Sequence, residues 1–270
     1  MTKSEFYRDV LLAQTKDAQW FDFEGLIRDA YQVILRPGDL SVDVGANIGV
    51  HAFQMAEAVY PGGRVIAVEA VAELIEGMRE AGRRYYPQLL PLISFENVAL
   101  SDHEGQASFC YCPKESGLSS LVDRAWVTPS EKRSIDVRVT RLDDLLAGGG
   151  GGRVRFIKVD VEGGEFHVLK GAKLTLAKDR PIVVFEHAEW SPGDFGYCIE
   201  EMREFFAGLD YQVFDVFGLP YDRLDDWSNM LVWTFFAVPS SELEDGKRIF
   251  DVVQKSLAAI GIHYQLSDVS

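Results

Sequence analysis

Apolar and polar positions follow two rhythms along this chain, one typical of buried strands and one of amphipathic helices. Strand-like apolar runs occupy 40–45, 62–70, 93–100, 154–164, 180–190, 211–218 and 230–239. Between them, apolar residues recur three and four positions apart, as at Leu74, Ile75 and Met78, which indicates helices that bury one face. Residues 1 to about 32 also have a helical pattern. Strands that alternate with helices favour an α/β fold with a parallel, doubly wound sheet.

The segment 101–150 interrupts this order. Residues 107–112 and 134–140 alternate like antiparallel strands, and 119–126 lies between them as a loop. Five consecutive glycines at 148–152 predict a flexible surface connection, because they offer no side chain to pack.

Length and composition favour one folded domain. The chain has 270 residues, of which 47% are apolar, enough for a large core. We find no internal repeat and no clear boundary, so we predict a single domain with an N-terminal helical cap over 1–35 and an α/β domain over 36–270. The formal net charge of −15 argues against a protein that coats nucleic acid or anionic lipid, because phosphate neutralisation needs clustered Lys and Arg.

The cysteines and the N-terminal residues bear on the compartment. Cys110, Cys112 and Cys198 are an odd set without C-x-x-C spacing, which predicts neither a disulfide framework nor a zinc site. The N-terminal apolar stretch contains acidic residues, unlike a signal peptide, and no run approaches the roughly 18 apolar residues of a spanning helix. We therefore expect a cytoplasmic protein without a nucleic-acid or membrane partner; the sequence does not predict its oligomeric state.

The turn after the first strand, "VDVGANIGVHAF", predicts a ligand site. A P-loop needs a lysine after its second glycine, and here Val50 follows Gly49. A dinucleotide fingerprint needs a middle glycine for close approach of the pyrophosphate, and Asn47 occupies that position. A ligand with an adenosine but no phosphate, such as S-adenosylmethionine, suits the turn better.

Two acids support this interpretation. Asp43 can attract the ammonium of the methionine moiety, while free N–H groups of the turn hold its carboxylate. Glu69 ends the second strand, where a carboxylate can accept both ribose hydroxyls. The alternative is that both acids only cap neighbouring helices.

Six blocks of the chain resemble, in the same order, the FkbM-type S-adenosylmethionine-dependent methyltransferases: "DVGANIG", "VIAVEA", "NVALSD", "SSL", "TRLDDLL" and "FIKVDVEGGEFHVLKGA". The resemblance covers about 40 to 240. Ala70 stands where the family more often has proline, and Gly164 where it often has alanine. The resemblance implies a class I methyltransferase (Rossmann-like) fold of seven strands, the last antiparallel, and mainly O-methylation of sugar or natural-product hydroxyls.

The resemblance also implies cofactor contacts. The methionine end would lie on Asp43, Gly45, Ala46, Asn47 and Gly49. The ribose would lie on Glu69 beside Ala70, the adenine near Ala99, Ser101 and Asp102, and the reacting sulfur near Asp160.

Methyl transfer to a hydroxyl requires alignment and removal of a proton, so acid–base residues are expected at the ends of the fourth and fifth strands. Candidates there are Lys158, Asp160, Glu162, Glu165, Glu186, His187 and Glu189. We expect catalysis from Lys158, Asp160, Glu162 and His187, with His187 as the general base because it titrates near neutral pH. The alternative for Lys158 is a salt bridge to Asp160 or Glu162 that holds the strand end.

A second mechanism uses a metal. Asp160 with Glu186, Glu162 or His187 would offer hard ligands to Mg²⁺ or another divalent ion, which would lower the pKa of the acceptor hydroxyl. No ligand spacing requires this site.

Residues 116–126 and the aromatics Trp20, Phe21 and Phe23 are predicted to form the acceptor side or a lid. Trp190, Phe195 and Tyr197 would add an aromatic wall for a sugar ring, although ordinary packing explains each of them equally well.

The leading function is thus an O-methyltransferase acting on a small-molecule or carbohydrate acceptor. N-methylation of an amine or amide and a catalytically silent cofactor-binding protein remain alternatives. A nicotinamide-dependent oxidoreductase is disfavoured by the missing glycine and by the lack of a Tyr-x-x-x-Lys arrangement.

Overall fold

The computed structural model describes residues 3, 5–8, 10, 22–123, 131–148, 152–187, 191–221, 232–259 and 261–264. Within this part of the chain, no helix has the length and apolar character needed to cross a membrane.

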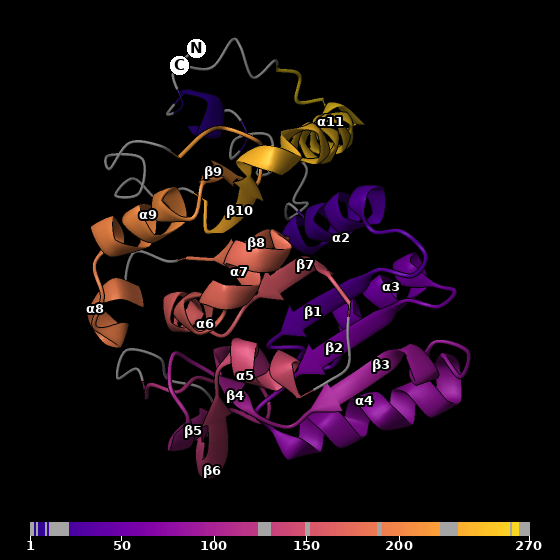
Figure 1. The fold of residues 1–270 in the computed structure, drawn as a ribbon, viewed down its shortest axis with the longest axis vertical. Helices are drawn as coiled ribbons and strands as arrows, with labels where there is room; N and C mark the ends of the chain where they lie inside the picture. The colour runs from indigo at the N-terminus through magenta and orange to yellow at the C-terminus, as the bar shows by residue number, and fades with distance from the viewer. Residues whose placement is uncertain are drawn as a thin grey trace.

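A seven-stranded sheet forms the centre of the molecule (Figure 1). Its order is β3 (Ile93–Glu96), β2 (Arg64–Val68), β1 (Leu40–Val44), β7 (Val154–Val159), β8 (Ile182–Glu186), β10 (Thr234–Pro239) and β9 (Tyr211–Asp215). The strands from β3 to β8 pair in parallel, and β10 runs antiparallel to both of its neighbours. The predicted doubly wound sheet with an antiparallel last strand is confirmed.

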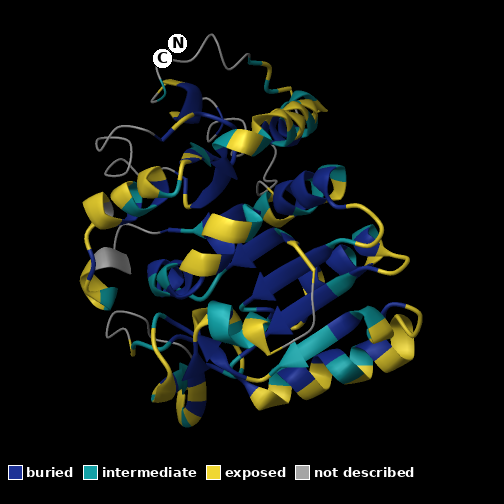
Figure 2. Cartoon of the chain, in the orientation of Figure 1, coloured by how far each residue is buried: buried dark blue, intermediate teal, exposed yellow. Residues whose placement is uncertain are grey.

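Helices cover both faces of this sheet, so that its central strands are buried on each side (Figure 2). One core layer includes side chains from α2 (Phe23–Ile34), α3 (Val50–Val59), α4 (Ala72–Tyr85) and α11 (Leu243–Ala259). The other includes side chains from α5 (Leu142–Ala147), α6 (Glu165–Gly171), α7 (Lys173–Asp179) and α9 (Ile199–Gly208). The short helix α8 (Ser191–Phe195) precedes α9, and 3-10 turns lie at η1 (Leu90–Leu92), η2 (Ser116–Leu118) and η3 (Ser240–Glu242).

The interrupting segment forms a second, three-stranded sheet of β4 (Ala99–Leu100), β6 (Arg133–Thr140) and β5 (Gly105–Tyr111), in which β5 and β6 make the expected antiparallel hairpin. The prediction of one strand over 93–100 was wrong. After Glu96 the chain leaves the central sheet, and Asn97 donates hydrogen bonds to the carbonyls of Glu69 and Ala70 (3.0 and 2.9 Å). The following residues therefore pair with β6 instead of β2.

The N-terminal residues belong to the same core as the sheet. Phe6 and Tyr7 are buried against Phe217 in the loop after β9. The Tyr7 hydroxyl also donates to the buried Asp215 (2.7 Å). These contacts fit a single packed unit, while the boundary at residue 35 stays a prediction.

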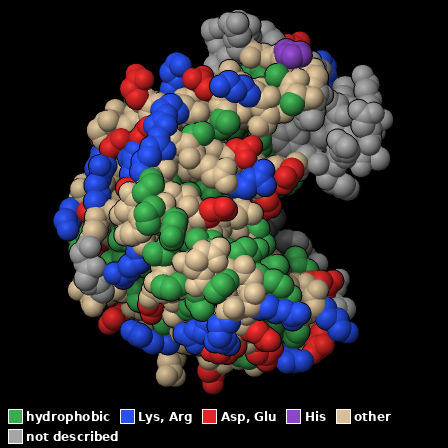
Figure 3. Space-filling view, turned by 90° about the vertical axis from the view of Figure 1, so that its right-hand side faces the viewer, with side chains coloured by type: hydrophobic (Ala, Val, Ile, Leu, Met, Phe, Trp, Pro, Cys, Tyr) green, Lys and Arg blue, Asp and Glu red, His purple; other side chains and the backbone are tan. Residues whose placement is uncertain are grey.

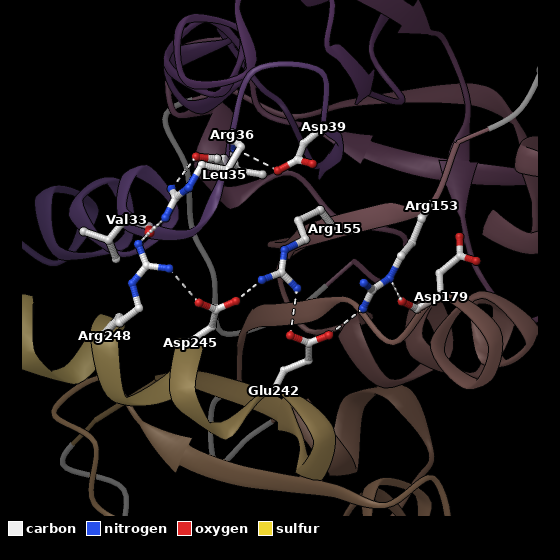
Figure 4. Close-up of polar contacts among 10 residues, drawn as sticks. All are labelled: Val33, Leu35, Arg36, Asp39, Arg153, Arg155, Asp179, Glu242, Asp245 and Arg248. Atoms are coloured by element: carbon white, nitrogen blue, oxygen red, sulfur yellow. Dashed lines mark hydrogen bonds and ion pairs between the residues drawn. The ribbon is translucent and has the colours of Figure 1, made fainter.

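A network of ion pairs joins α11 and α2 to the start of β7 (Figure 4). Arg155 pairs with Glu242 (3.2 Å) and with Asp245. Arg248 pairs with Asp245 (2.8 Å) and donates to the carbonyl of Val33 at the end of α2. Arg153 reaches Glu242 (2.6 Å), so each acid in the network has two cationic partners. Basic and acidic side chains are also interspersed on the face seen in Figure 3.

Candidate functional site

A cleft lies over the carboxyl ends of β1, β2 and β7. Its empty space, including the part open to solvent, is about 670 Å³. It is lined by Val44, Gly45, Asn47, Val68, Glu69, Ala70, Val98, Ala99, Leu100, Phe109, Ser116, Gly117, Ser119, Leu121, Asp160, Val161, Glu162, Gly164 and Phe195. The cleft thus combines the glycine turn after β1, the ends of β2 and β7 on either side of β1, and one side of the β5–β6 insertion.

The glycine turn links β1 to α3 in a conformation that depends on residue type. Gly45, Asn47 and Gly49 all have positive φ, of 78°, 50° and 86°, a region open to Gly and tolerated by Asn. A Cβ on Gly45 would lie 1.8 Å from the carbonyl oxygen of Asp160, so β1 and β7 can approach only because this residue is glycine. No side chain caps the start of α3 at Gly49, which leaves the helix end available to an anionic group.

Glu69 lines the cleft and also holds its backbone together. Its two carboxylate oxygens accept hydrogen bonds from the N–H groups of Asn47 and Val71, each at 2.9 Å. Burial raises the pKa of Glu69, and these N–H groups oppose the shift. The backbone-binding role considered as an alternative is therefore present. It does not exclude ribose binding, because each carboxylate oxygen has a second lone pair.

Asp43 is buried and does not itself line the cleft. It is 1% exposed, and neither of its carboxylate oxygens accepts a hydrogen bond. Its strand position faces Lys158 in the β1–β7 register. Burial raises the pKa of Asp43, although the nearby charges of Lys158 and His51 favour ionisation. An unsatisfied buried carboxylate is costly, and a cationic ligand group would offset that cost.

The predicted salt bridge at the end of β7 is present: the ammonium of Lys158 donates to Asp160 Oδ2 at 2.9 Å. Lys158 is 4% exposed. Burial alone would lower the pKa of Lys158. The carboxylates of Asp160 and Asp43 outweigh burial and raise the pKa above its usual value, so Lys158 stays charged. Asp160 lines the cleft, whereas Lys158 lies beneath it.

The loop after β7 is shaped by Glu165. Its Oε1 accepts the N–H groups of Val161 and Gly163 (3.0 and 2.9 Å), and burial raises the pKa of Glu165 to about 7. The loop brings Glu162, with φ of 59°, to the cleft wall. Ser120 of the insertion donates to the Glu162 carbonyl (3.1 Å) and so connects the two sides of the cleft.

His187 lies outside the cleft. It is 1% exposed and packs with Tyr197 and Phe235, on the opposite face of the sheet from Lys158. Its Nδ1 is 3.3 Å from the Tyr197 hydroxyl, and burial lowers the pKa of His187 to about 4. It does not line the cleft. The structure therefore does not bring this predicted base to Asp160, and its catalytic role stays a prediction.

The residues predicted near the adenine divide into two groups. Ala70 and Ala99 line the cleft; Ser101 and Asp102 do not. Asp102 pairs with Lys170 (2.8 Å), and although partial burial opposes it, this contact holds the pKa of Asp102 at about 2.

The insertion supplies lining residues that the sequence analysis did not assign to the cofactor site. Phe109 and Leu121 are examples, and Ser116 donates to the Asn47 side chain at 2.8 Å. The "SSL" block was the available signal, and it was interpreted as acceptor side or lid.

The predicted metal ligands do not assemble. Among the described residues, no three His, Cys, Asp or Glu side chains are grouped closely enough to hold a metal ion. Of the predicted aromatics, Phe195 lines the cleft and Tyr197 is buried, while Phe23 packs against Trp233 with tilted rings whose centroids are 4.8 Å apart. Trp20, Phe21, Glu189, Trp190 and residues 124–126 lie outside the described residues.

Comparisons with known proteins identify the family of this chain. The family model described as "Methyltransferase FkbM domain" matches residues 43–213. The chain is 28% identical over 165 residues to a hexuronic acid methyltransferase, AglP, of Haloferax volcanii, covering 61% of this chain and 63% of the relative. It is 30% identical over 168 residues to the 31-O-demethyl-FK506 methyltransferase FkbM of Streptomyces tacrolimicus, covering 52% and 62%.

A third relative is the AMB antimetabolite synthetase AmbE of Pseudomonas aeruginosa, 27% identical over 188 residues, which are 57% of this chain and 9% of that protein. The matches thus span less than two thirds of each of these relatives. Among solved structures, the methyltransferase FkbM from Methylobacillus flagellatus KT is 18% identical, with a TM-score of 0.48, 87% of this chain covered and 60% of that chain. Because the family model spans more than half of it, this chain belongs to the methyltransferase FkbM domain family.

Proposed function

We propose that this chain is an S-adenosylmethionine-dependent O-methyltransferase whose acceptor is a hydroxyl of a sugar or a natural-product-like small molecule. The observation that carries the proposal is the placement of two acids around the glycine turn. Asp43 is buried without a hydrogen-bond partner near the end of β1, and Glu69 lines the cleft at the end of β2. Those positions suit the ammonium and the ribose of one ligand that crosses both strand ends.

The cleft fits such a donor chemically. Its β2 side is apolar around Val98, Leu100 and Phe109, which suits an adenine ring, and its β7 side ends in Asp160. A bound donor would bring an activated methyl group to the end of β7. There this chain has to orient the acceptor, exclude water and receive a proton.

The hydroxyl acceptor is supported by the relatives. One is named a hexuronic acid methyltransferase and another a 31-O-demethyl-FK506 methyltransferase, and the second name refers to methylation at an oxygen. The abundance of carboxylates beside Asp160 also supplies proton acceptors, which a hydroxyl needs more than an amine does. N-methylation and a silent cofactor-binding protein are the competing proposals.

Titration calorimetry with S-adenosylmethionine, S-adenosylhomocysteine and NAD tests the cofactor, on the wild type and on Glu69→Ala. We expect micromolar binding of both sulfur ligands, at least tenfold weaker binding to the variant, and no heat with NAD. Glu96→Gln is a matched control, since Glu96 also ends a parallel strand but does not line the cleft. Absence of binding by both sulfur ligands would refute the proposal.

A further inference from the structure

The carboxylates at the carboxyl end of the sheet differ in what they contact. Asp160 is paired with Lys158, while Glu69 and Glu165 each accept two backbone N–H groups. Glu186, the last residue of β8, makes no hydrogen bond or ion pair within the part of the chain that the structure describes. Its side chain is partly buried and adjoins Asp160, which lines the cleft, whereas Glu186 itself does not line it.

Strand register places Glu186 beside Asp160. The last pair between β7 and β8 is Val159 with Phe185, so the next residues along both strands are Asp160 and Glu186. Side chains alternate along a strand, and Val184, two residues earlier, belongs to the core beneath α2 and α11. Glu186 therefore faces the same side as Lys158, whereas His187 faces the other.

Other polar groups on this side also lack partners. Thr234 pairs with Glu186 in the β8–β10 register, is fully buried, and its hydroxyl has no hydrogen-bond partner. Asp43 and Ser41, two strands away on the same side, are further such groups. Buried polar atoms are nearly always satisfied in native proteins, so the orphans Thr234 and Asp43, on the strands that flank β7 and β8, indicate a polar ligand.

This inference rests on the proposed function and deepens it. We propose that Glu186 is the carboxylate that faces the reacting methyl group, lying against the sulfonium of the donor and receiving the proton of the acceptor hydroxyl. A donor whose ammonium is at Asp43 and whose ribose is at Glu69 would lie over the ends of β1 and β2, and its methionine end would adjoin Asp160 at the end of β7, the other neighbour of β1. The next strand end beyond Asp160 is that of β8.

The reaction balances at this position. The methyl–sulfur bond breaks with its electron pair left on sulfur, and the new carbon–oxygen bond forms as the hydroxyl proton passes to the carboxylate of Glu186. The sulfonium charge and the carboxylate charge therefore disappear together, and no uncompensated charge remains in the site. Burial raises the pKa of Glu186, Asp160 raises it further and Lys158 opposes them, so the carboxylate is a good proton acceptor once the sulfonium is gone.

The test compares a charged and an uncharged ligand on Glu186→Gln, which keeps the size and removes the charge. S-adenosylmethionine and the amine analogue sinefungin carry a positive charge at the reacting position, and S-adenosylhomocysteine does not. We expect the preference for the two charged ligands over S-adenosylhomocysteine to fall about tenfold, which corresponds to one charge contact, while S-adenosylhomocysteine binds within about twofold of its wild-type affinity. Glu96→Gln should leave all three affinities unchanged.

An unchanged preference in Glu186→Gln, or equal weakening of all three ligands, would overturn the inference. Failure of the wild type to bind any of them would instead refute the proposed function. If Glu186→Gln does not fold, as judged by circular dichroism, Glu186→Asp is used in its place. Aspartate retains the charge, but its shorter side chain moves the carboxylate away from the sulfonium, so the preference for the charged ligands should fall by a smaller factor.

Discussion

The two ends of β7 carry opposite kinds of charge cluster. At its start, Arg155 is joined by Arg153 and Arg248, and the three arginines share Glu242 and Asp245. At its end, Lys158 is the single lysine or arginine in the described cluster that it forms with Asp43, Asp160 and Glu186. The first cluster satisfies its charges within the protein, while the second leaves negative charge unsatisfied.

This contrast separates a structural role from a binding role. Paired charges between α2, β7 and α11 fix helices against the sheet and gain nothing from a ligand. Unpaired carboxylates cost stability in the free protein, and a cationic ligand recovers that cost on binding. The predictions below test this difference, starting with the largest effect.

Replacing Lys158 with Met should destabilise the protein most. The change removes the cation between three buried or partly buried carboxylates, and breaking a buried pair in this way typically costs about 3–5 kcal/mol. Arg155→Met is the matched change at the other end of the strand. There Glu242 and Asp245 each retain an arginine, so the loss should be smaller. Urea unfolding at pH 7 measures both, and equal losses would contradict the contrast.

The two clusters should also respond to pH with opposite sign. Burial raises the pKa of Glu165, beside the second cluster, to about 7, so its stabilising contribution is complete below about 4.5 and is lost as pH rises towards 7. Arg153 and Arg155 lower the pKa of Glu242 against partial burial, so its contribution is present above about 4.5 and is lost as pH falls through the lowered value.

Single substitutions separate the contributions of Glu165 and Glu242 to the pH dependence of stability. Glu165→Gln keeps an oxygen for the two N–H groups and should remove a decline in unfolding free energy on the order of 1–3 kcal/mol between pH 5 and 7.5. Glu242→Gln should instead be less stable than the wild type at pH 7 and approach it under acid conditions. Denaturant unfolding from pH 7.5 down to below about pH 4.5 checks both signs, and an unchanged slope in Glu165→Gln would exclude its role.

How much of the fold and of the candidate site could be predicted from the sequence varies along the chain. The positions of Asp43, Glu69 and Asp160 were predictable because each lies at or just after the end of an apolar strand that the local pattern defines. The side of the sheet that Glu186 faces was not, because alternation shows that Glu186 and His187 face opposite sides but does not show which side carries Lys158. That assignment depends on the β7–β8 register, which forms between segments distant in sequence.

The position of the β5–β6 insertion over the cleft was harder to predict. Residues 107–112 and 134–140 were predictable as a hairpin from their alternation, but the return of Phe109 and Ser116 over the cleft depends on β4 pairing with β6. The same pairing draws Ala99 away from the central sheet. Tertiary context therefore decided what local pattern left open.

Asp43→Asn should stabilise the free protein while weakening donor binding. The buried carboxylate has no hydrogen-bond partner and its surroundings raise its pKa, so the neutral amide is less costly there. We expect a gain of about 0.5–2 kcal/mol in unfolding free energy, the range common for such changes at functional sites. Thermal unfolding with and without S-adenosylmethionine measures both effects, and loss of stability without ligand would show that Asp43 is structural.

Removing an exposed cation from the paired cluster should have the smallest effect. Arg153 is about half exposed, so Arg153→Ala loses an ion pair to Glu242 that solvent already screens. Exposed pairs contribute about 0.2–1 kcal/mol, and Arg155 continues to neutralise Glu242 after the change. We expect a loss within that range, smaller still in 1 M salt, and unchanged affinity for S-adenosylmethionine. A larger loss that salt does not reduce would show that Arg153 acts through its hydrogen bond to the Asp179 carbonyl (2.6 Å), and so by holding α7 against β7.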